Sequence, residues 1–217
     1  KMAVFVILII AAQLFFIVCE LAPMGLTFFA VNNVNRELLN ITIQPGWIQS
    51  INSITIIIAA PILGVIFNAF KKRNKTISIP LQFFIGLCLT WMGIFLLPLG
   101  IHFANTQGYT SFIWLAMYYV FLAIAELCIS PIGFSMVGKL IPLSMQSLMM
   151  GIVLLNTGVA AVLASFFSNY AMGNIKSTNP LITNQHYSHS FSLLATVAFC
   201  FSLLLFLLIP ILNRWQK

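Results

Sequence analysis

The fold class of this chain follows from a short stretch in its second apolar run, Thr55-Ile56-Ile57-Ile58-Ala59-Ala60. The strands of a membrane barrel alternate apolar and polar side chains over about ten residues. This stretch has no such alternation, and the apolar run that contains it continues over residues 46–70. Because lipid offers the backbone no hydrogen bonds, only a helix satisfies its own backbone within one such run. The run therefore predicts a transmembrane helix.

The composition of the whole chain agrees with a membrane protein. The 217 residues are 61% apolar and 6% charged, and the mean hydropathy is +1.05. Soluble domains contain about 25% charged residues, which this chain lacks. Polar breaks divide the sequence into six apolar runs, and we expect one helix in each: residues 4–31, 46–70, 79–102, 111–141, 147–172 and 189–213. Residues 1–217 are thus predicted to form a single all-α, polytopic bundle of six transmembrane helices.

The basic residues indicate how the chain is oriented in the membrane. The net charge is +7, but Lys and Arg lie at the ends of apolar runs and do not form the polar basic face of a nucleic-acid binder. With a cytoplasmic N-terminus, only Arg36 and Lys176 fall on the far side. The cytoplasmic side then receives Lys1, Lys71, Lys72, Arg73, Lys75, Lys139, Arg214 and Lys217. By the positive-inside rule we expect a multi-pass protein of the cell (inner) membrane with both termini in the cytoplasm, in contact with membrane lipid and not with nucleic acid.

One carboxylate lies in the middle of an apolar run. Glu126 follows Phe121-Leu122-Ala123-Ile124-Ala125 and has no basic residue within helical reach. A charged side chain at the bilayer centre costs roughly 2.5–3.5 kcal/mol on insertion scales, so we expect Glu126 to face the bundle interior or a water-filled cavity. Its helical face also carries Tyr119, Ala123, Ser130 and Gly133. We predict a functional site at Glu126; the alternative is a hydrogen-bonded glutamate that joins two helices.

A second acid inside an apolar run is Glu20, which shares a helical face with Gln13 and Thr27 at intervals of seven residues. Pro23 lacks an amide hydrogen and should bend or loosen the helix beside this acid. We predict that Glu20 and Pro23 take part in proton exchange and gating. The alternative is that Glu20 makes a packing contact with another helix.

Polar side chains on two other runs are candidates for the same cavity. Gln49, Asn52 and Thr55 follow one another at intervals of three, and such amides bind peptide-like or sugar-like ligands or join helices. Asn156 lies in the fifth run, where the small residues that follow it fit close helix packing. We predict that Gln49 and Asn52 line a cavity, and we count Ser130 and Asn156 among the candidate substrate-binding residues.

No pattern in the sequence indicates an enzyme. It contains no nucleophile motif, no phosphate-binding glycine loop and no paired metal ligands, and its four cysteines are too far apart to share a metal. His102, His186 and His189 fall at or beyond the ends of the predicted helices, where solvated positions are expected. We therefore predict a protein that is not an enzyme and that needs no cofactor or metal.

A weak internal repeat relates the two halves of the chain. The segment Glu20-Leu21-Ala22-Pro23-Met24-Gly25 resembles Glu126-Leu127 followed by Pro131-Ile132-Gly133, with a longer gap in the second copy. Each copy falls in the first helix of a three-helix group, and three spans reverse the direction of the second group. The pattern predicts a 3+3 inverted repeat, as in many transporters.

The fourth run also resembles a known family. Residues 125–140, from Ala125-Glu126-Leu127 to Gly138-Lys139-Leu140, are similar to the tenth helix of the proton-dependent oligopeptide transporters, which are twelve-helix members of the major facilitator superfamily. Residues 148–151 resemble the start of the eleventh helix and residues 47–52 the start of the eighth. Residues 15–20, with Asn33-Val34, are similar to the seventh. The resemblance implies that the chain is the C-terminal six-helix half of a major facilitator fold, with an N-terminal six-helix bundle as its missing partner.

The resemblance further implies symport of small peptides, with protons as the coupling ion. Glu126 would bind the amino terminus of the peptide in a central cavity that Asn52 also lines. Glu20 would belong to the region coupled to protonation, and we assign Pro23 and Pro131 to gating.

The sequence departs from the family pattern at several positions. Val153 stands where the family has a tryptophan gate, Leu21 replaces a glutamine and Ser53 replaces a proline. Two alternatives therefore stay open. One is a major facilitator transporter of another small solute, and the other is a membrane scaffold without transport, in which both buried acids only join helices.

Overall fold

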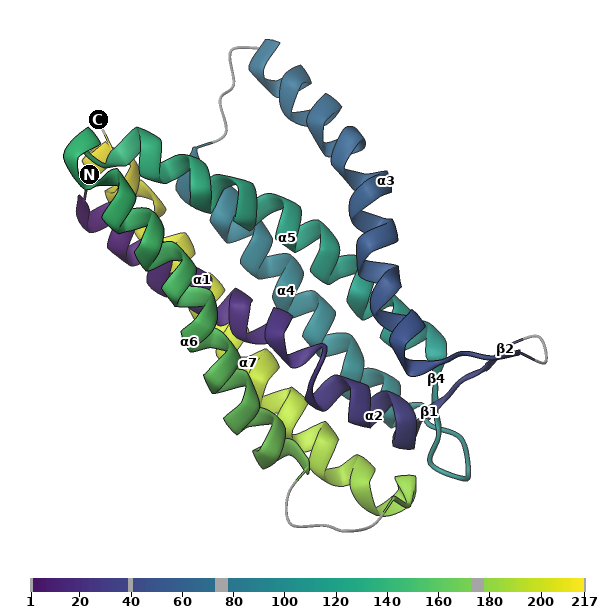
Figure 1. The fold of residues 1–217 in the computed structure, drawn as a ribbon. Helices are drawn as coiled ribbons and strands as arrows, with labels where there is room; N and C mark the ends of the chain where they lie inside the picture. The colour runs from purple at the N-terminus through teal and green to yellow at the C-terminus, as the bar shows by residue number, and fades with distance from the viewer. Residues whose placement is uncertain (1, 39–40, 73–77, 173–177, 217) are drawn as a thin grey trace.

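The computed structural model describes residues 2–38, 41–72, 78–172 and 178–216 (Figure 1). The helices are α1 (Met2–Leu21), α2 (Gly25–Asn33), α3 (Pro45–Lys72), α4 (Ile79–His102), α5 (Phe112–Leu140), α6 (Gln146–Met172) and α7 (Pro180–Gln216), with a 3-10 turn at Leu143–Met145. Four strands of two residues each join them: β1 (Val34–Asn35), β2 (Glu37–Leu38), β3 (Ile41–Thr42) and β4 (Thr110–Ser111).

The described chain contains 6 helices long and apolar enough to cross a membrane, with α2 lying outside this set because of its length. This confirms the predicted all-α membrane class and its number of spans. The two ends of the chain lie together at one end of the bundle, called here the terminal end, and the short strands lie at the opposite end, called here the strand end (Figure 1).

Two predicted helix boundaries are wrong. The expected helix over residues 4–31 is interrupted by a turn at residues 22–24, so that it forms α1 and α2. The last helix begins at Pro180 instead of residue 189, because the polar residues after Pro180 bury one helical face: Thr183, Tyr187 and Ser190 are all buried. His186 and His189 therefore lie on α7 and not in a loop, although both are exposed.

The helices pack in pairs that cross between the two halves of the chain. α1 packs against α6, α3 packs against α5, and α4 packs against both α5 and α7. In an inverted repeat that relates α1 to α5 and α3 to α6, the first two contacts are equivalent. The packing thus agrees with the predicted 3+3 arrangement.

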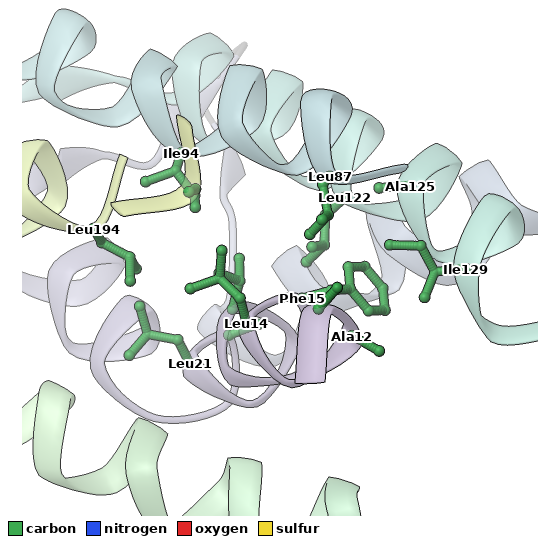
Figure 2. Close-up of a cluster of buried hydrophobic side chains, with 14 of the residues drawn as sticks. Ala12, Leu14, Phe15, Leu21, Leu87, Ile94, Leu122, Ala125, Ile129 and Leu194 are labelled. Carbon is green, nitrogen blue, oxygen red and sulfur yellow. The ribbon is translucent and has the colours of Figure 1, made fainter. Parts of the chain in front are cut away.

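The core lies around α1. Figure 2 shows side chains of α1, α4, α5 and α7 that meet there: Ala12, Leu14, Phe15, Leu21, Leu87, Ile94, Leu122, Ala125, Ile129 and Leu194. Phe15 and Leu87 have no exposed surface. Because lipid is as apolar as these side chains, their close packing, and not the hydrophobic effect, holds the helices together inside a membrane.

α3 is the exception to this packing. Its apolar stretch has 0% of its residues buried inside the structure, and Ile57 and Val65 are 72% and 70% exposed. Figure 1 shows that α3 leans away from the other helices toward the terminal end. Its apolar side chains therefore face either lipid or protein that lies outside the described residues.

A buried polar cluster joins the elements at the strand end. Asn33, at the end of α2, has no exposed surface and donates from Nδ2 to Thr183 Oγ1 at 2.6 Å and to Asn184 Oδ1 at 2.8 Å. Asn184 in turn donates to the carbonyl of Gly108 at 2.6 Å. Gly108 has φ of +86°, and a Cβ there would lie 3.0 Å from the Leu181 nitrogen, so only glycine suits this turn. Parallel pairing of β1 with β4 completes the connection.

Replacing Asn33 by alanine should lower the free energy of unfolding by about 1–3 kcal/mol, because Thr183 and Asn184 would lose a buried partner. The measurement is the thermal unfolding midpoint of the purified protein in detergent. Asn32→Ala is the matched control, since Asn32 is the neighbouring residue and is half-exposed. Equal midpoints for the two variants would contradict the role assigned to this cluster.

Candidate functional site

A pocket of about 380 Å³ lies where the break between α1 and α2 meets α3 and α5. Each of these elements contributes part of the wall. The lining residues are Cys19, Ala22, Pro23, Gly46, Gln49, Ser50, Asn52, Ser53, Tyr119, Leu122 and Glu126. The pocket therefore combines the interrupted helix with two of the predicted polar faces.

The central contact of the pocket joins α3 to α5. Asn52 donates from Nδ2 to Glu126 Oε2 at 3.1 Å. The other amide atom, Asn52 Oδ1, is buried and has no hydrogen-bond partner among the described residues. An ionised carboxylate only accepts hydrogen bonds, so Glu126 keeps further acceptor capacity for a ligand that donates.

The interrupted helix forms the opposite wall, and its hydrogen bonds explain the break. Pro23 has no N–H, so the carbonyl of Cys19 lacks its usual donor four residues later. The Ala22 N–H donates to Cys19 O at 3.2 Å instead, and Met24 N–H donates to Leu21 O at 3.2 Å. Both bonds span three residues, which tightens the chain into the turn that separates α1 from α2.

Side chains satisfy a carbonyl that the break leaves free. The Thr27 hydroxyl donates to Ala22 O at 3.0 Å. Gln49, which lines the pocket from α3, donates from Nε2 to Thr27 Oγ1 at 3.4 Å. The position of Gln49 is thus connected to the turn through Thr27.

The structure brings four of the predicted site residues together and leaves four apart. Glu126, Asn52, Gln49 and Pro23 line the pocket. Four others lie outside its lining: Glu20, Ser130, Pro131 and Asn156.

Three of these outlying residues lie close in sequence to the lining. Glu20 is half-buried on α1 and directly follows Cys19. Ser130 is half-buried on α5, one turn beyond Glu126. Pro131 is exposed and lies inside an uninterrupted α5, so it does not break its helix as Pro23 does.

Asn156 contacts α1 instead. Its Nδ2 donates to the carbonyl of Ile9 at 3.5 Å. With its amide oriented to satisfy both polar atoms, Gln13 donates to the side-chain oxygen of Asn156 and accepts from the N–H of Ala160 at 3.1 Å. Val153, expected at the position of the aromatic gate, is 4% exposed and belongs to the core.

Several lining residues carried no recognisable signal in the sequence. Cys19, Ala22 and Leu122 are ordinary residues of apolar runs, and only the tertiary structure places them around the pocket. Tyr119 was recognised on the face of Glu126 and does line the pocket, whereas Ala123 on the same face is fully buried. The face of α5 that carries Tyr119, Ala123 and Glu126 extends over several turns, and α3 packs against only part of it.

The pocket is suited to binding a cationic or hydrogen-bond-donating group. It presents a carboxylate, two amides and two serine hydroxyls beside apolar side chains. Within the described ranges no group of three or more His, Cys, Asp or Glu residues could hold a metal ion. Hydrogen bonding and charge are the chemistry that these polar lining residues offer.

Comparison with known sequences gives one family over most of the chain. A model described as the POT family matches residues 1–183. Dipeptide and tripeptide permease A of Klebsiella pneumoniae is 35% identical over 217 residues, which are 100% of this chain and 43% of that protein. Dipeptide and tripeptide permease B of Salmonella typhimurium is 32% identical over 214 residues, 99% of this chain and 44% of that protein. The chain thus spans less than half the length of these relatives. Their names are those of permeases, which agrees with the prediction that this protein is not an enzyme.

Solved structures agree on the fold. A crystal structure of the peptide transporter POT in complex with sulfate superposes with a TM-score of 0.85 at 23% identity, covering 98% of this chain and 40% of that one. A structure of a mutant of a POT peptide transporter in complex with alafosfalin gives the same TM-score and identity, covering 98% of this chain and 41% of that one. At this identity the similarity establishes the fold alone: the six spans of this chain are arranged as in the matched part of these transporters.

Proposed function

This chain belongs to the POT family, and from that premise we propose that it supplies the C-terminal half of a proton-coupled symporter of small peptides. The observation that carries the proposal is the hydrogen-bonded pair of Asn52 and Glu126 in a pocket beside the helix break. Glu126 binds the peptide ammonium group, and Asn52 and Gln49 donate to or accept from the peptide backbone. The names of the related permeases support this choice of substrate.

Coupling to protons is proposed to depend on Glu20 and on the helix break. Glu20 lies three residues before Pro23, on the segment where α1 ends. A change in its protonation alters charge beside the turn, and the turn forms one wall of the pocket. We propose a gating function for Pro23 on this basis, and for Pro131 because it follows Glu126 on α5. Ser130, which lies between Glu126 and Pro131 on the same helix, is proposed to bind substrate.

The partner of this chain is proposed to be a second six-helix bundle that lies N-terminal to it in the full-length protein. The coverage of the relatives supports this proposal, because the chain matches less than half of their length. The unpacked apolar face of α3 offers a surface for such a bundle, and alternating access requires two bundles that rock against each other. Asn156 of α6 stays a proposed substrate-binding residue, although its side chain contacts Ile9 and Gln13 of α1 in this structure.

The orientation is proposed from charge. The basic residues predict both termini on the cytoplasmic side of the inner membrane. The two ends of the chain do lie at the same end of the bundle (Figure 1), which is consistent with an even number of spans. Lys72, Lys139 and Arg214 support the assignment from the described residues, whereas Lys1, Arg73, Lys75, Lys176 and Lys217 lie outside them.

Uptake by the reconstituted full-length protein tests this function. With an inward proton gradient, proteoliposomes should accumulate a labelled dipeptide, and a protonophore should abolish the accumulation. A panel of free amino acids, sugars and other small solutes is the control for specificity. Gradient-driven uptake of one of these solutes without dipeptide uptake would favour the alternative transporter, and absence of any flux would favour the scaffold.

A further inference from the structure

At the end of α1, beside the break, a carbonyl group accepts a hydrogen bond from a side chain of α5. In an uninterrupted helix the Ala22 N–H would donate to the carbonyl of Val18. Because Pro23 offers no N–H to Cys19 O, the Ala22 N–H turns to that carbonyl at 3.2 Å. Sharing the Ala22 N–H between two carbonyls weakens its ordinary bond to the carbonyl of Val18, a fully buried residue in the last turn of α1.

Tyr118 of α5 supplies a further donor to this carbonyl. Its hydroxyl donates to Val18 O at 3.2 Å. Both residues are buried, with Tyr118 1% exposed and Val18 0% exposed. The bond joins residues 100 positions apart and connects the end of α1 to the helix that carries Glu126.

The two residues in this bond directly precede residues of the pocket. Val18 is followed by Cys19, and Tyr118 is followed by Tyr119; both successors line the pocket. Further along the same segments, Ala22 and Pro23 lie in the turn after α1 and, with Cys19, form what is called here the α1 wall of the pocket. Leu122 and Glu126 form its α5 wall. The bond therefore holds the two walls at a set distance without contacting the pocket itself.

We propose that Tyr118 is a positioning residue for the pocket: its hydroxyl takes over the Val18 carbonyl at the helix break and ties the α1 wall to the α5 wall. Its effect on substrate affinity rests on the proposed function. Its effect on the geometry of the wall does not.

Cys19 offers a direct measure of that geometry, because it lines the pocket and is half-buried. In the full-length protein with every other cysteine replaced by alanine, the rate of labelling with a small maleimide reports how often this wall opens. Tyr118→Phe removes only the hydroxyl, and we expect labelling to accelerate about fivefold, the factor that a typical buried hydrogen bond provides. Tyr170→Phe is the matched control, since Tyr170 is 58% exposed on α6. A Tyr118→Phe rate within about twofold of the parent, or a slower one, would overturn the proposal.

A double-mutant cycle separates this role from general packing. Pro23→Ala restores an N–H for Cys19 O and frees the Ala22 N–H for Val18 O, so the hydroxyl of Tyr118 is no longer needed. In the Pro23→Ala background, Tyr118→Phe should therefore change the labelling rate by less than about twofold. Equal effects in both backgrounds would mean that Tyr118 acts only through packing, and this would also overturn the proposal.

Uptake kinetics test the consequence for binding. Tyr118→Phe should raise KM for a dipeptide about fivefold and leave Vmax within about twofold, because a wall that opens more often weakens binding without removing a contact to the substrate. Accelerated labelling with an unchanged KM would overturn the role in positioning the substrate site. If the parent protein shows no dipeptide uptake, the proposed function fails, and the labelling rates still decide the role of Tyr118 at the break.

Discussion

Replacing Glu126 by glutamine should reduce gradient-driven dipeptide uptake by about 10-fold to 100-fold, which corresponds to one hydrogen bond to a charged group. Glutamine has the same size and can still accept the 3.1 Å bond from Asn52, so the pocket keeps its shape. What it loses is the negative charge. The peptide ammonium group then has no ionic partner, because Glu126 is the single carboxylate among the described residues that line the pocket.

Initial rates of uptake into proteoliposomes check this expectation, together with the unfolding midpoint of each variant. Glu37→Gln is the matched control, because Glu37 is an exposed acid at the strand end. The midpoint should not change in either variant. If Glu126→Gln leaves the initial rate of dipeptide uptake unchanged, the proposed role of this carboxylate is excluded. That result would favour a glutamate that only joins helices.

Replacing Asn52 by leucine should reduce uptake by about 10-fold through the loss of a hydrogen bond to a charged acceptor. Leucine keeps the approximate volume but removes both polar atoms of the amide. Glu126 then loses its α3 donor, and the buried Oδ1 atom is no longer offered to the substrate. Asn68→Leu is the control, because Asn68 is exposed on the same helix.

The double variant tests more sharply than either single variant whether Asn52 and Glu126 act as a pair. If Asn52 acts largely through Glu126, the double variant Asn52→Leu/Glu126→Gln should lose much less uptake than the product of the two single losses. Independent, multiplicative losses in initial rate would show that the two side chains contact different parts of the substrate and would contradict their action as a pair.

Several elements of the fold were predictable because hydropathy is summed over many residues. Each of the six spans in the described chain is at least 20 residues long and mostly apolar, so a few polar residues do not hide it. The expected range 79–102 coincides with α4 for this reason, and Pro45 marks the start of α3 as proline at a helix start should. The sequence also predicts that the helix bends or loosens at Pro23, since the loss of one N–H is a local property of the sequence.

Other features depend on partners that are distant in the sequence. The start of α7 was placed nine residues too late, because Thr183, Asn184 and Tyr187 are polar or amphipathic residues whose burial depends on Asn33 and Phe29 of α2. The contacts of Asn156 with Gln13 and Ile9 of α1 also depend on how distant helices pack, so the sequence does not predict them. Its role in binding substrate stays a prediction.

Composition and periodicity are thus sufficient for the class of protein, the number of membrane spans and the acids inside the apolar runs, because lipid forces every span to satisfy its own backbone. They also identify Glu126 and Asn52 as unusual polar residues. That these two side chains meet, and that Tyr118 reaches Val18 across 100 residues, follows only from the tertiary structure. The physical reason is that a polar group inside a membrane needs a partner, while the partner's identity depends on which helices pack together.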